Sequence, residues 1–415
     1  MRLELDVGAV AHGGHCVARH DGRVVFVRHA LPGERVRADV TEDGESARFW
    51  RADAVEVVQA SEHRVEPRCP FAGPGRCGGC DWQHVDLGEQ RRLKAAVVAE
   101  QLRRLAGLAI GADEVLVESV PGDDDGLRWR TRVRLAVDDD GRAGLRRHRS
   151  HDVVTMPDCP LTHPGLGLAD VLVQRWPHGA ELHVTGGDGR EPTVEVVDPT
   201  ASRDVVAHRS GPARRLEHAA GRSWRVTGSG FWQVHPGAAD ALVGAVREAV
   251  QPRAGDTVLD LYSGVGLFAG SLGVDVGPSG HVVAVESAEQ AVRDARRNVH
   301  DLPWVRLAQG RVDRFLHQSD SPTHVDLVVL DPPRTGAGAA VCRAIARRGP
   351  RRVAYVACDP AALARDLRTF AETGYEVVRV RAFDMFPMTH HVESVVTLQP
   401  SDAQGRMVAD SKGPA

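Results

Sequence analysis

Segments typical of strands and of helices alternate from about residue 250 to residue 400, and no other feature of the chain constrains its fold as strongly. Five apolar runs are expected to form buried strands, at residues 257–261, 281–285, 305–308, 326–330 and 353–357. Helices are expected after four of them, at residues 267–272, 288–299, 339–347 and 361–373, with two further strands at 376–382 and 392–398. Such alternation predicts an α/β fold with a doubly wound sheet, in which ligands bind at the carboxyl ends of the strands.

The first 250 residues are organised differently. Residues 1–59 show the period-two alternation and regular turns of a small OB-like β-barrel, with strands expected at 2–7, 23–27, 34–40 and 49–58. Barrels of this type commonly bind oligonucleotides, although such a barrel can also serve only to pack on its neighbour. We therefore predict a barrel at 1–59, a central α+β domain at 60–235, the α/β domain at 236–400 and a disordered tail at 401–415.

Composition limits where the protein works and what it binds. No apolar run approaches the roughly 18 residues of a membrane-spanning helix, and the first residues do not resemble a secretion signal, so we expect a cytoplasmic protein. The net charge of −4 does not itself indicate a polyanion partner. Residues 128–149 contain eight arginines and three aspartates, which indicates either phosphate contacts or only a general preference for arginine over lysine.

A glycine-bearing loop follows the first strand of the α/β domain, in the sequence VLDLYSGVGLFAG. Gly264 and Gly266 let the backbone approach a ligand, and Glu286 at the end of the second strand suits ribose hydroxyls. These features fit either a dinucleotide or S-adenosylmethionine (SAM). The loop lacks the third glycine of the dinucleotide fingerprint and has Leu267-Phe268 in its place, which favours SAM, as does the Asp-Pro-Pro-Arg motif that begins at Asp331.

Two residues at strand ends are candidates for catalysis. Cys358 ends the fifth strand, where the start of the next helix and Arg334 are expected to lower the thiol pKa; a buried, inert thiol is the alternative. Cys342 lies within a helical pattern and is expected in the core. Glu393 opens the last strand and is a candidate general base. His390 and His391 precede it, and we do not expect a metal there because adjacent side chains on an extended chain diverge.

Four further cysteines suggest a metal centre. Cys69, Cys77 and Cys80 form a C-x7-C-x2-C pattern, and Cys159 can complete a set of four thiolates. Such a set fits a [4Fe–4S] cluster or a structural zinc, and the spacing leaves both open. The total of seven cysteines argues against a disulfide framework.

The motifs DPPRTG, ACDP and FPMTHHVES together resemble the RNA uracil-C5 methyltransferases, which make 5-methyluridine in ribosomal and transfer RNA. The resemblance covers about residues 1–400. It implies a class I SAM-dependent methyltransferase domain, an N-terminal RNA-binding TRAM domain and a central iron–sulfur domain. It also implies SAM-binding roles for the residues that match the family motifs, namely Gln233 in GSGFWQVHP, Tyr262, Glu286, Asp313 and Asp331. Spacing alone leaves Asp313 equally well explained as a solvated loop residue.

The resemblance further implies a covalent mechanism. The Cys358 thiolate would add to carbon 6 of a flipped-out uracil, carbon 5 would accept the methyl group, and Glu393 would remove the carbon 5 proton. The cysteine set resembles that of the branch acting on 23S ribosomal RNA, which favours the cluster over zinc and ribosomal over transfer RNA. We expect the cluster to be structural and the protein to be monomeric. His235, Leu267 and Asp359 depart from residues common in the family.

Three other functions agree less well with the sequence, two of them enzymatic and one not. A cytosine-C5 methyltransferase would have proline before its nucleophile, but Ala357 stands there. An adenine-N6 methyltransferase would have an aromatic residue where Arg334 follows Asp-Pro-Pro. A non-catalytic RNA-binding or folding factor would not need both Cys358 and Glu393.

Overall fold

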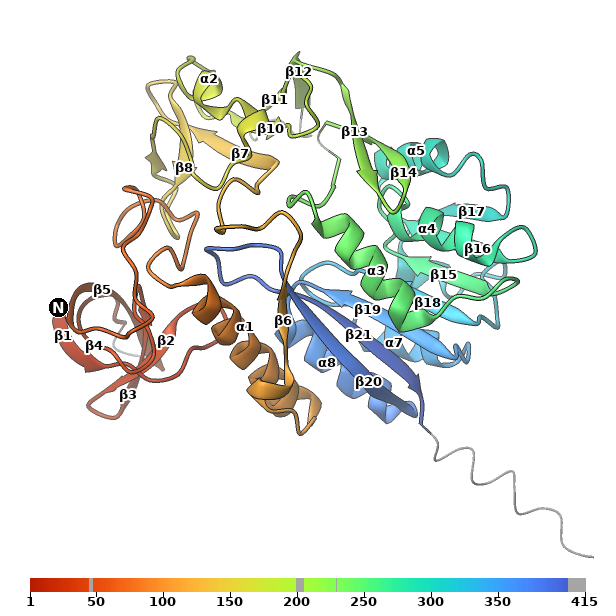
Figure 1. The fold of residues 1–415 in the computed structure, drawn as a ribbon, viewed down its shortest axis with the longest axis horizontal. Coiled ribbons are helices and arrows are strands. Elements are labelled where there is room, and N and C mark those ends of the chain that lie inside the picture. Colours follow the sequence, from red (N-terminus) through yellow and green to blue (C-terminus); the bar gives the residue numbers. More distant parts are fainter. Residues whose placement is uncertain (45–47, 199–204, 229, 402–415) are drawn as a thin grey trace, which may run out of the picture.

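The computed structural model describes residues 1–44, 48–198, 205–228 and 230–401 (Figure 1). The disordered tail is predicted at 401–415, and its residues 402–415 lie outside this range. Within the described range, none of the helices has both the length and the apolar character needed to cross a bilayer.

The N-terminal residues form a five-stranded sheet in the order β1-β4-β5-β3-β2. Its strands are β1 (Arg2–Asp6), β2 (Cys16–His20), β3 (Arg23–Arg28), β4 (Arg35–Glu42) and β5 (Phe49–Gln59). The two edges are joined where the Gly8 amide donates to the Val17 carbonyl (2.7 Å) and the Val17 amide donates to the Ala9 carbonyl (2.9 Å). The sheet therefore closes as the predicted barrel. The sequence pattern missed only β2, which begins at the buried Cys16.

The middle of the chain contains a second sheet, with strand order β12-β11-β10-β7-β8-β9. The strands are β7 (Arg132–Val137), β8 (Ala143–Arg146), β9 (Val153–Val154), β10 (Glu181–Thr185), β11 (Thr193–Asp198) and β12 (Val205–Ser210). A short helix, α2 (Leu168–Leu172), lies between β9 and β10, and a separate hairpin, β13 (Arg214–Ala219) and β14 (Arg222–Thr227), follows. Buried side chains such as Trp129, Leu135 and Leu182 form the core of this region.

The C-terminal sheet has eight strands in the order β17-β16-β15-β18-β19-β21-β20-β6, which confirms the predicted doubly wound fold. Its main strands are β15 (Thr257–Leu261), β16 (His281–Glu286), β17 (Val305–Gln309), β18 (Leu327–Leu330), β19 (Arg352–Ala357), β20 (Tyr375–Asp384) and β21 (Glu393–Pro400). The first five are parallel, and β21 inserts antiparallel between β19 and β20. This arrangement brings the end of β19 and the start of β21 to the same edge of the sheet.

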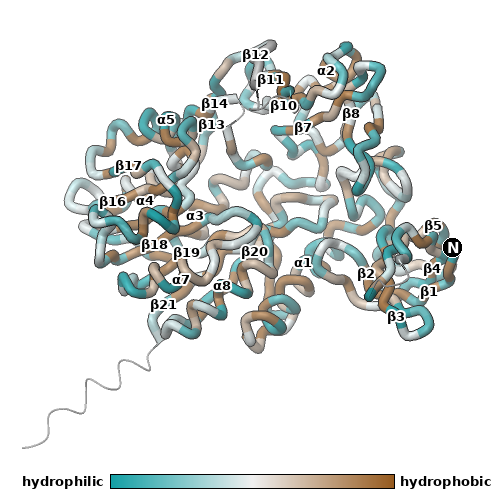
Figure 2. The backbone as a smooth tube through the Cα atoms, turned by 180° about the vertical axis from the view of Figure 1, so that it is seen from behind, coloured by the Kyte–Doolittle hydropathy of each residue, from teal (hydrophilic) through white to brown (hydrophobic). Residues whose placement is uncertain are grey.

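Helices cover both faces of this sheet. One apolar layer includes α7 (Ala339–Ala346) and α8 (Pro360–Glu372), and the other includes α3 (Ala238–Val250) and α4 (Leu267–Val276). The helices α5 (Glu289–Asn298) and α6 (Val312–Phe315) complete the domain. Figure 2 shows α5 as a hydrophilic outer segment, in keeping with its sequence EQAVRDARRN.

Residues that precede 236 also take part in the C-terminal sheet. The edge strand β6 (Val117–Ser119) pairs in parallel with β20, through Val117 and Ala382. The helix α1 (Leu87–Gln101) lies beside α8 (Figure 1). Its Val98 and other side chains belong to the apolar layer that α8 shares. Part of the segment predicted as the central domain is therefore packed on the α/β domain, and the boundary at residue 236 stays a prediction.

Candidate active site

The glycine loop after β15 has the open backbone expected of a ligand-binding turn. Gly264 has φ +54°, and a side chain added there would meet no atom within 4 Å. Gly266, with φ +91°, precedes α4, and Tyr262 also adopts positive φ, +64°. Positive φ is costly for a residue with a side chain, so the turn is held by its surroundings rather than by local preference.

Glu286 holds this loop in place from the end of β16. One carboxylate oxygen accepts the Gly264 amide at 3.0 Å, and the other accepts the Ala288 amide at 2.7 Å. A carboxylate oxygen accepts more than one hydrogen bond, so Glu286 retains acceptor capacity toward a ligand hydroxyl.

Sequence reasoning missed Asp260, which lies on β15 and is 1% exposed. One oxygen accepts the Ala269 amide at 2.8 Å, and the other has no hydrogen-bond partner among the described residues. Burial raises the Asp260 pKa to about 8, and the charges of Asp331 and Glu286 act in the same direction. An acidic residue within an otherwise apolar strand, as in VLDLY, is the signal that could have identified it.

The other predicted cofactor residues differ in their surroundings. Tyr262 is partly buried, and its pKa is raised to about 12, mainly by burial and to a smaller extent by Asp313 and other nearby groups. Asp313 lies on α6 and forms a surface ion pair with Arg311 at 2.8 Å. Gln233 is 9% exposed, and its side chain forms no hydrogen bond with the described residues. Its neighbour Val234 accepts both the amide and the hydroxyl of Thr131 at 2.9 Å.

The pairing of β19 with β21 sets the relation between the two catalytic candidates. Ala357 pairs with Ser394 in this antiparallel ladder, so Cys358 and Glu393 come next on the two strands and face one another across it. Cys358 is partly exposed, whereas Glu393 is 4% exposed. The sequence predicted both positions, but it could not show that they lie opposite one another.

The electrostatics of Cys358 differ from the sequence expectation. Burial, together with the negative charges of Glu393 and Asp331, raises the pKa of the thiol to about 11. Arg334 acts in the expected direction and lowers it, but it does not outweigh the other effects. The expectation of a lowered thiol pKa is therefore wrong for the protein without ligands.

Asp331 and Glu393 form a buried acidic pair. Burial raises the pKa of Asp331 to about 7 and raises that of Glu393 well above its usual range. The charge of Asp331 raises the Glu393 pKa further, whereas Arg334 lowers it. Two carboxylates close together in a dry site do not both ionise readily, so one proton is retained near neutral pH.

The loop before Glu393 is anchored by residues far away in the sequence. The Asp81 and Trp82 amides both donate to the Met388 carbonyl at 3.0 Å, and the Met388 amide donates to the Gln90 side chain at 2.8 Å. His390 contacts the Asp81 carboxylate through its ring at 2.6 Å. His390 thus has an acidic hydrogen-bond partner on the loop that carries Asp81.

A buried ion pair that no local sequence pattern predicts ties the same loop to α1. Lys94 and Asp384 are both fully buried, 2.5 Å apart, and Lys94 also donates to the Phe386 carbonyl at 3.1 Å. Lys94 is one of two lysines in the whole chain, but nothing in its helical context separates it from a surface residue.

Four cysteines line one small cavity in the central region. Cys69, Cys77, Cys80 and Cys159 surround it together with Arg130 and other side chains. Burial raises the thiol pKa of Cys77 and Cys159, and raises that of Cys80 to about 12. In the described part of the chain, no three His, Cys, Asp or Glu side chains have the geometry to hold a single metal ion. The predicted grouping of these cysteines is found, and Cys342 lies in the core as expected, 0% exposed.

Known proteins identify the family. Residues 218–401 match the model for tRNA (Uracil-5-)-methyltransferase, and residues 2–55 match the TRAM domain. An RNA methyltransferase of Streptomyces avermitilis is 51% identical, covering 96% of this chain and 98% of its own. A Bifidobacterium longum RNA methyltransferase is 40% identical, covering 95% and 96%. The chain belongs to the RNA uracil-5-methyltransferase family.

A solved structure agrees with the observed fold. The tRNA (uracil-54, C5)-methyltransferase of Pyrococcus abyssi, in complex with S-adenosyl-L-homocysteine, superposes with a TM-score of 0.70. It is 24% identical and covers 95% of this chain and 99% of its own. At this identity the likeness supports the methyltransferase fold. Family membership establishes that the protein is an RNA methyltransferase, and the barrel is its TRAM domain.

Proposed function

We propose that this enzyme methylates carbon 5 of a uridine in RNA, with Cys358 as covalent nucleophile and Glu393 as base. The observation that carries the proposal is the register of β19 and β21, which sets Cys358 opposite Glu393 at the edge where the parallel strands end. Asp331 and Arg334 act electrostatically on both. The protein thereby offers a nucleophile and a base to two adjacent carbons of one flat ring.

Cys358 makes carbon 5 reactive. Its thiolate forms a bond to carbon 6 of the uracil, and the electron pair of the 5,6 double bond moves into the ring as an enolate. Carbon 5 then carries the electrons needed to bond a methyl carbon. Bound SAM would supply that methyl group as an electrophile, and its sulfur would keep the bonding electrons as the neutral thioether. Because the thiol pKa in the free protein is about 11 even beside Arg334, the bound ligands must favour the thiolate.

Glu393 completes the reaction. After methylation, carbon 5 carries both a proton and the new methyl group. Glu393 removes the proton, its electron pair re-forms the 5,6 double bond, and the Cys358 thiolate leaves carbon 6. The raised pKa of Glu393 makes it a stronger base than an exposed carboxylate, and Arg334 favours its charged form before it acts.

The loop after β15 fits SAM. Gly264 leaves open space for close approach, and Glu286 can accept ribose hydroxyls. Asp260 and Ser263 each contribute a buried oxygen with no hydrogen-bond partner among the described residues, as a site that receives a polar ligand requires. We propose that the cofactor is held by Gln233, Tyr262, Gly264, Gly266, Glu286, Asp313 and Asp331.

The four cysteines are proposed to hold a [4Fe–4S] cluster with a structural role. Their four thiols line one cavity, and a set of four thiolates is the donor set that such a cluster takes. The cluster would fix the loop that carries Cys80, whose neighbours Asp81 and Trp82 anchor the segment before Glu393. Iron and acid-labile sulfide analysis of anaerobically purified protein tests this, and stoichiometric zinc without iron would refute it.

We propose 23S ribosomal RNA as the substrate because of the cysteine set, with transfer RNA as the second candidate. The second candidate is supported by the description of the matching family model and by the activity for which the Pyrococcus abyssi protein is named. A monomer is proposed to suffice, because the barrel, the central region and the C-terminal sheet of one chain all contact the segments around Cys358 and Glu393.

Nucleoside mass spectrometry tests the proposed reaction. Unmodified 23S ribosomal RNA and unmodified transfer RNA are each incubated with the purified protein and SAM, with Cys358→Ala as the control. We expect 5-methyluridine from the wild-type enzyme on one RNA and none from the variant. Another methylated nucleoside would refute the mechanism but not the cofactor, and methylation by Cys358→Ala would refute the nucleophile.

A further inference from the structure

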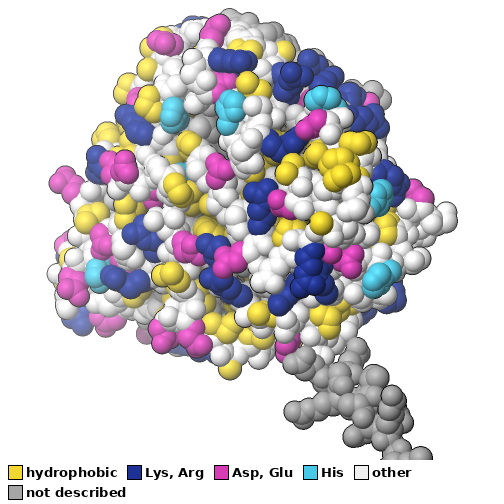
Figure 3. All heavy atoms as spheres, turned by 45° about the vertical axis from the view of Figure 1, so that its right-hand side comes forward, with side chains coloured by type: hydrophobic (Ala, Val, Ile, Leu, Met, Phe, Trp, Pro, Cys, Tyr) yellow, Lys and Arg dark blue, Asp and Glu magenta, His cyan; other side chains and the backbone are white. Residues whose placement is uncertain are grey.

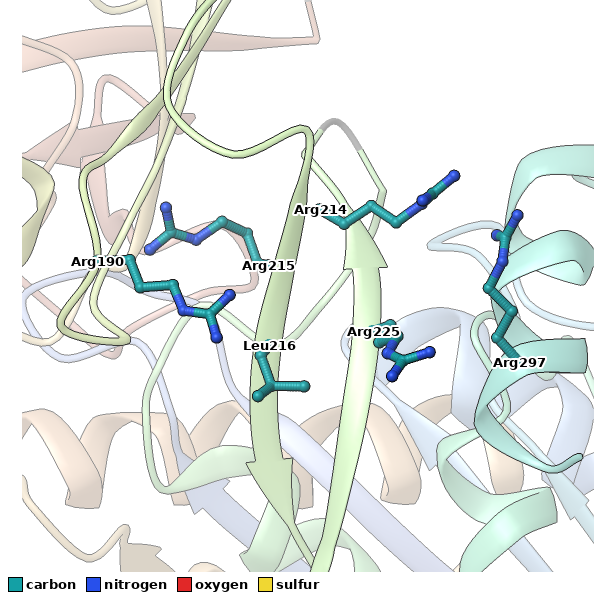
Figure 4. Close-up of a pocket in the computed structure, with 6 residues that line it drawn as sticks. All are labelled: Arg190, Arg214, Arg215, Leu216, Arg225 and Arg297. Carbon is teal, nitrogen blue, oxygen red and sulfur yellow. The ribbon is translucent and has the colours of Figure 1, made fainter. Parts of the chain in front are cut away.

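A pocket rich in arginine lies away from the catalytic residues, between the β13–β14 hairpin, α5 and the loop that follows β10 (Figure 4). It is lined by one leucine and five arginines, namely Leu216, Arg190, Arg214, Arg215, Arg225 and Arg297. Basic side chains gather in the upper part of Figure 3, the part of the molecule where Figure 1 places β13, β14 and α5. In a chain with a net charge of −4, such a concentration is a local property of this surface.

The hairpin register explains why the arginines share one face. Leu216 pairs with Arg225, and Arg214 lies two residues before Leu216, so all three side chains lie on the same side of the hairpin. Arg215 points to the other side and is 1% exposed. Figure 4 shows Arg214 and Arg225 extending from the hairpin toward the side of α5 that carries Arg297.

Two of the five arginines are bound within the protein. Arg215 forms an ion pair with Asp188 and donates to the Glu191 carbonyl at 2.5 Å, so it holds the loop that carries Arg190. Arg297 forms an ion pair with the buried Asp294 at 3.1 Å. These contacts fix the walls of the pocket.

The other three arginines have no acidic partner in the part of the chain that the structure describes. Across those residues, no carboxylate oxygen lies within 4.0 Å of the guanidinium group of Arg190, Arg214 or Arg225. Three exposed guanidinium groups around one hollow repel each other, and an anion between them relieves that repulsion. The planar guanidinium donates paired hydrogen bonds to two oxygens of a phosphate, which suits this group better than a single carboxylate from solvent.

We propose that this pocket binds phosphate groups of the RNA backbone, which extends the RNA contact beyond the TRAM barrel and the catalytic edge. This inference rests on the proposed function, because it takes the RNA substrate as the ligand. β14 continues into the segment that carries Gln233, and α5 begins three residues after Glu286. The pocket therefore lies on elements that adjoin the proposed cofactor residues in the sequence, while the barrel lies at the opposite side of the molecule (Figure 1). Phosphate contacts at this pocket would position the RNA without reading its sequence.

The double variant Arg214→Gln/Arg225→Gln tests the proposal, measured as binding of a fluorescently labelled single-stranded RNA of mixed sequence over a range of salt concentrations. Removing two phosphate contacts should weaken binding about tenfold at low salt and reduce the slope of log affinity against log salt by about 1.4. The matched control is Arg296→Gln/Arg347→Gln, which removes two exposed arginines that do not line the pocket. In methylation assays the test variant should raise KM for RNA and leave kcat unchanged.

Several outcomes would overturn the proposal. Unchanged affinity and slope, or an equal loss in the control variant, would show that the pocket does not contact the backbone. Thermal protection of the wild-type protein by inorganic phosphate or AMP, with RNA binding unaffected in the variant, would assign the pocket to a small phosphate compound. If the double variant does not fold, Arg190→Gln on the separate loop should still reduce the slope by about 0.7.

Binding is measured without SAM, so the two proposals can fail separately. A protein that makes no 5-methyluridine but loses RNA affinity in the double variant would refute the proposed reaction and retain the phosphate pocket. If the wild-type protein makes 5-methyluridine and the double variant keeps the wild-type salt slope, the proposed reaction is retained and the phosphate pocket is refuted.

Discussion

The His12 ring of the TRAM barrel lies 3.2 Å from the carboxylate of Asp359, the residue that follows Cys358. Asp359 also caps α8 by accepting the Ala362 amide at 2.7 Å. Beside this contact, the Gly14 carbonyl accepts the indole N–H of Trp82 at 3.1 Å. The barrel therefore contacts residues next to the proposed nucleophile in the folded protein, in addition to being linked to them through the chain.

The pair formed by His12 and Asp359 makes a pH-dependent contribution to stability. The hydrogen bond with Asp359 raises the His12 pKa from 6.5, so this contribution is fully present below pH 6.5 and is lost as pH rises through the raised value. Asp359 has its pKa lowered from 3.8 by His12 and backbone amides, so its contribution is present above that pH and is lost as pH falls through the lowered value. The pair therefore stabilises the protein most between pH 3.8 and pH 6.5, the ordinary pKa values of the two groups.

His12→Ala should therefore lower the melting temperature near pH 6 and have little effect near pH 9, where His12 is neutral. Thermal unfolding of both proteins across this range checks the difference. The control is His178→Ala, since His178 lies 3.4 Å from Asp139 in an exposed pair. A His12→Ala penalty that stays constant with pH would mean that the contact does not depend on charge.

Glu393→Gln should stop the reaction after methyl transfer, because a carboxamide at this position cannot take the carbon 5 proton and Cys358 then cannot leave carbon 6. We expect a covalent protein–RNA adduct that survives denaturing electrophoresis and contains a methyl group from radiolabelled SAM. The double variant Cys358→Ala/Glu393→Gln should form none. Free methylated RNA from Glu393→Gln at the wild-type rate would show that another group removes the proton.

Lys94→Met should strongly destabilise the protein, because it leaves the Asp384 carboxylate buried without its cation. Breaking a buried ion pair costs about 3–5 kcal/mol, whereas replacing both partners with apolar residues often costs little. Urea unfolding should therefore show a larger loss for Lys94→Met than for Lys94→Met/Asp384→Leu. Equal losses for the two variants would indicate that packing, rather than the uncompensated charge, sets the cost.

The sequence predicted those parts of the fold that repeat a local pattern. Apolar runs and turn residues located the barrel and the strands from Thr257 to Ala357, and strand ends located Cys358 and Glu393. The edge strand β6 was missed because three residues carry too little periodicity, and its pairing with β20 is decided by tertiary packing.

Electrostatic properties of the site were least accessible from sequence. The helix start and Arg334 suggested an activated thiol, but the burial of Cys358 and its proximity to Glu393 and Asp331 depend on three separate strand ends meeting. Lys94 and Asp384 are 290 positions apart in the sequence, and no local pattern predicts an ion pair between residues so far apart.

Arg334→Gln should move the reactivity of Cys358 to higher pH. In the free protein the thiol pKa is about 11, and Arg334 is the residue that lowers it, so removing this charge raises the pKa further and reduces the thiolate present near neutral pH. Iodoacetamide labelling of the Cys358 peptide against pH, followed by mass spectrometry, should show a midpoint above that of the wild-type protein, and kcat/KM for methylation should rise over the same shifted range. Arg347→Gln, which changes an exposed arginine at the end of α7, should leave the midpoint unchanged. An unchanged midpoint in Arg334→Gln would mean that the guanidinium does not act on the nucleophile, and the thiolate would then have to arise from contacts made only with bound RNA and SAM.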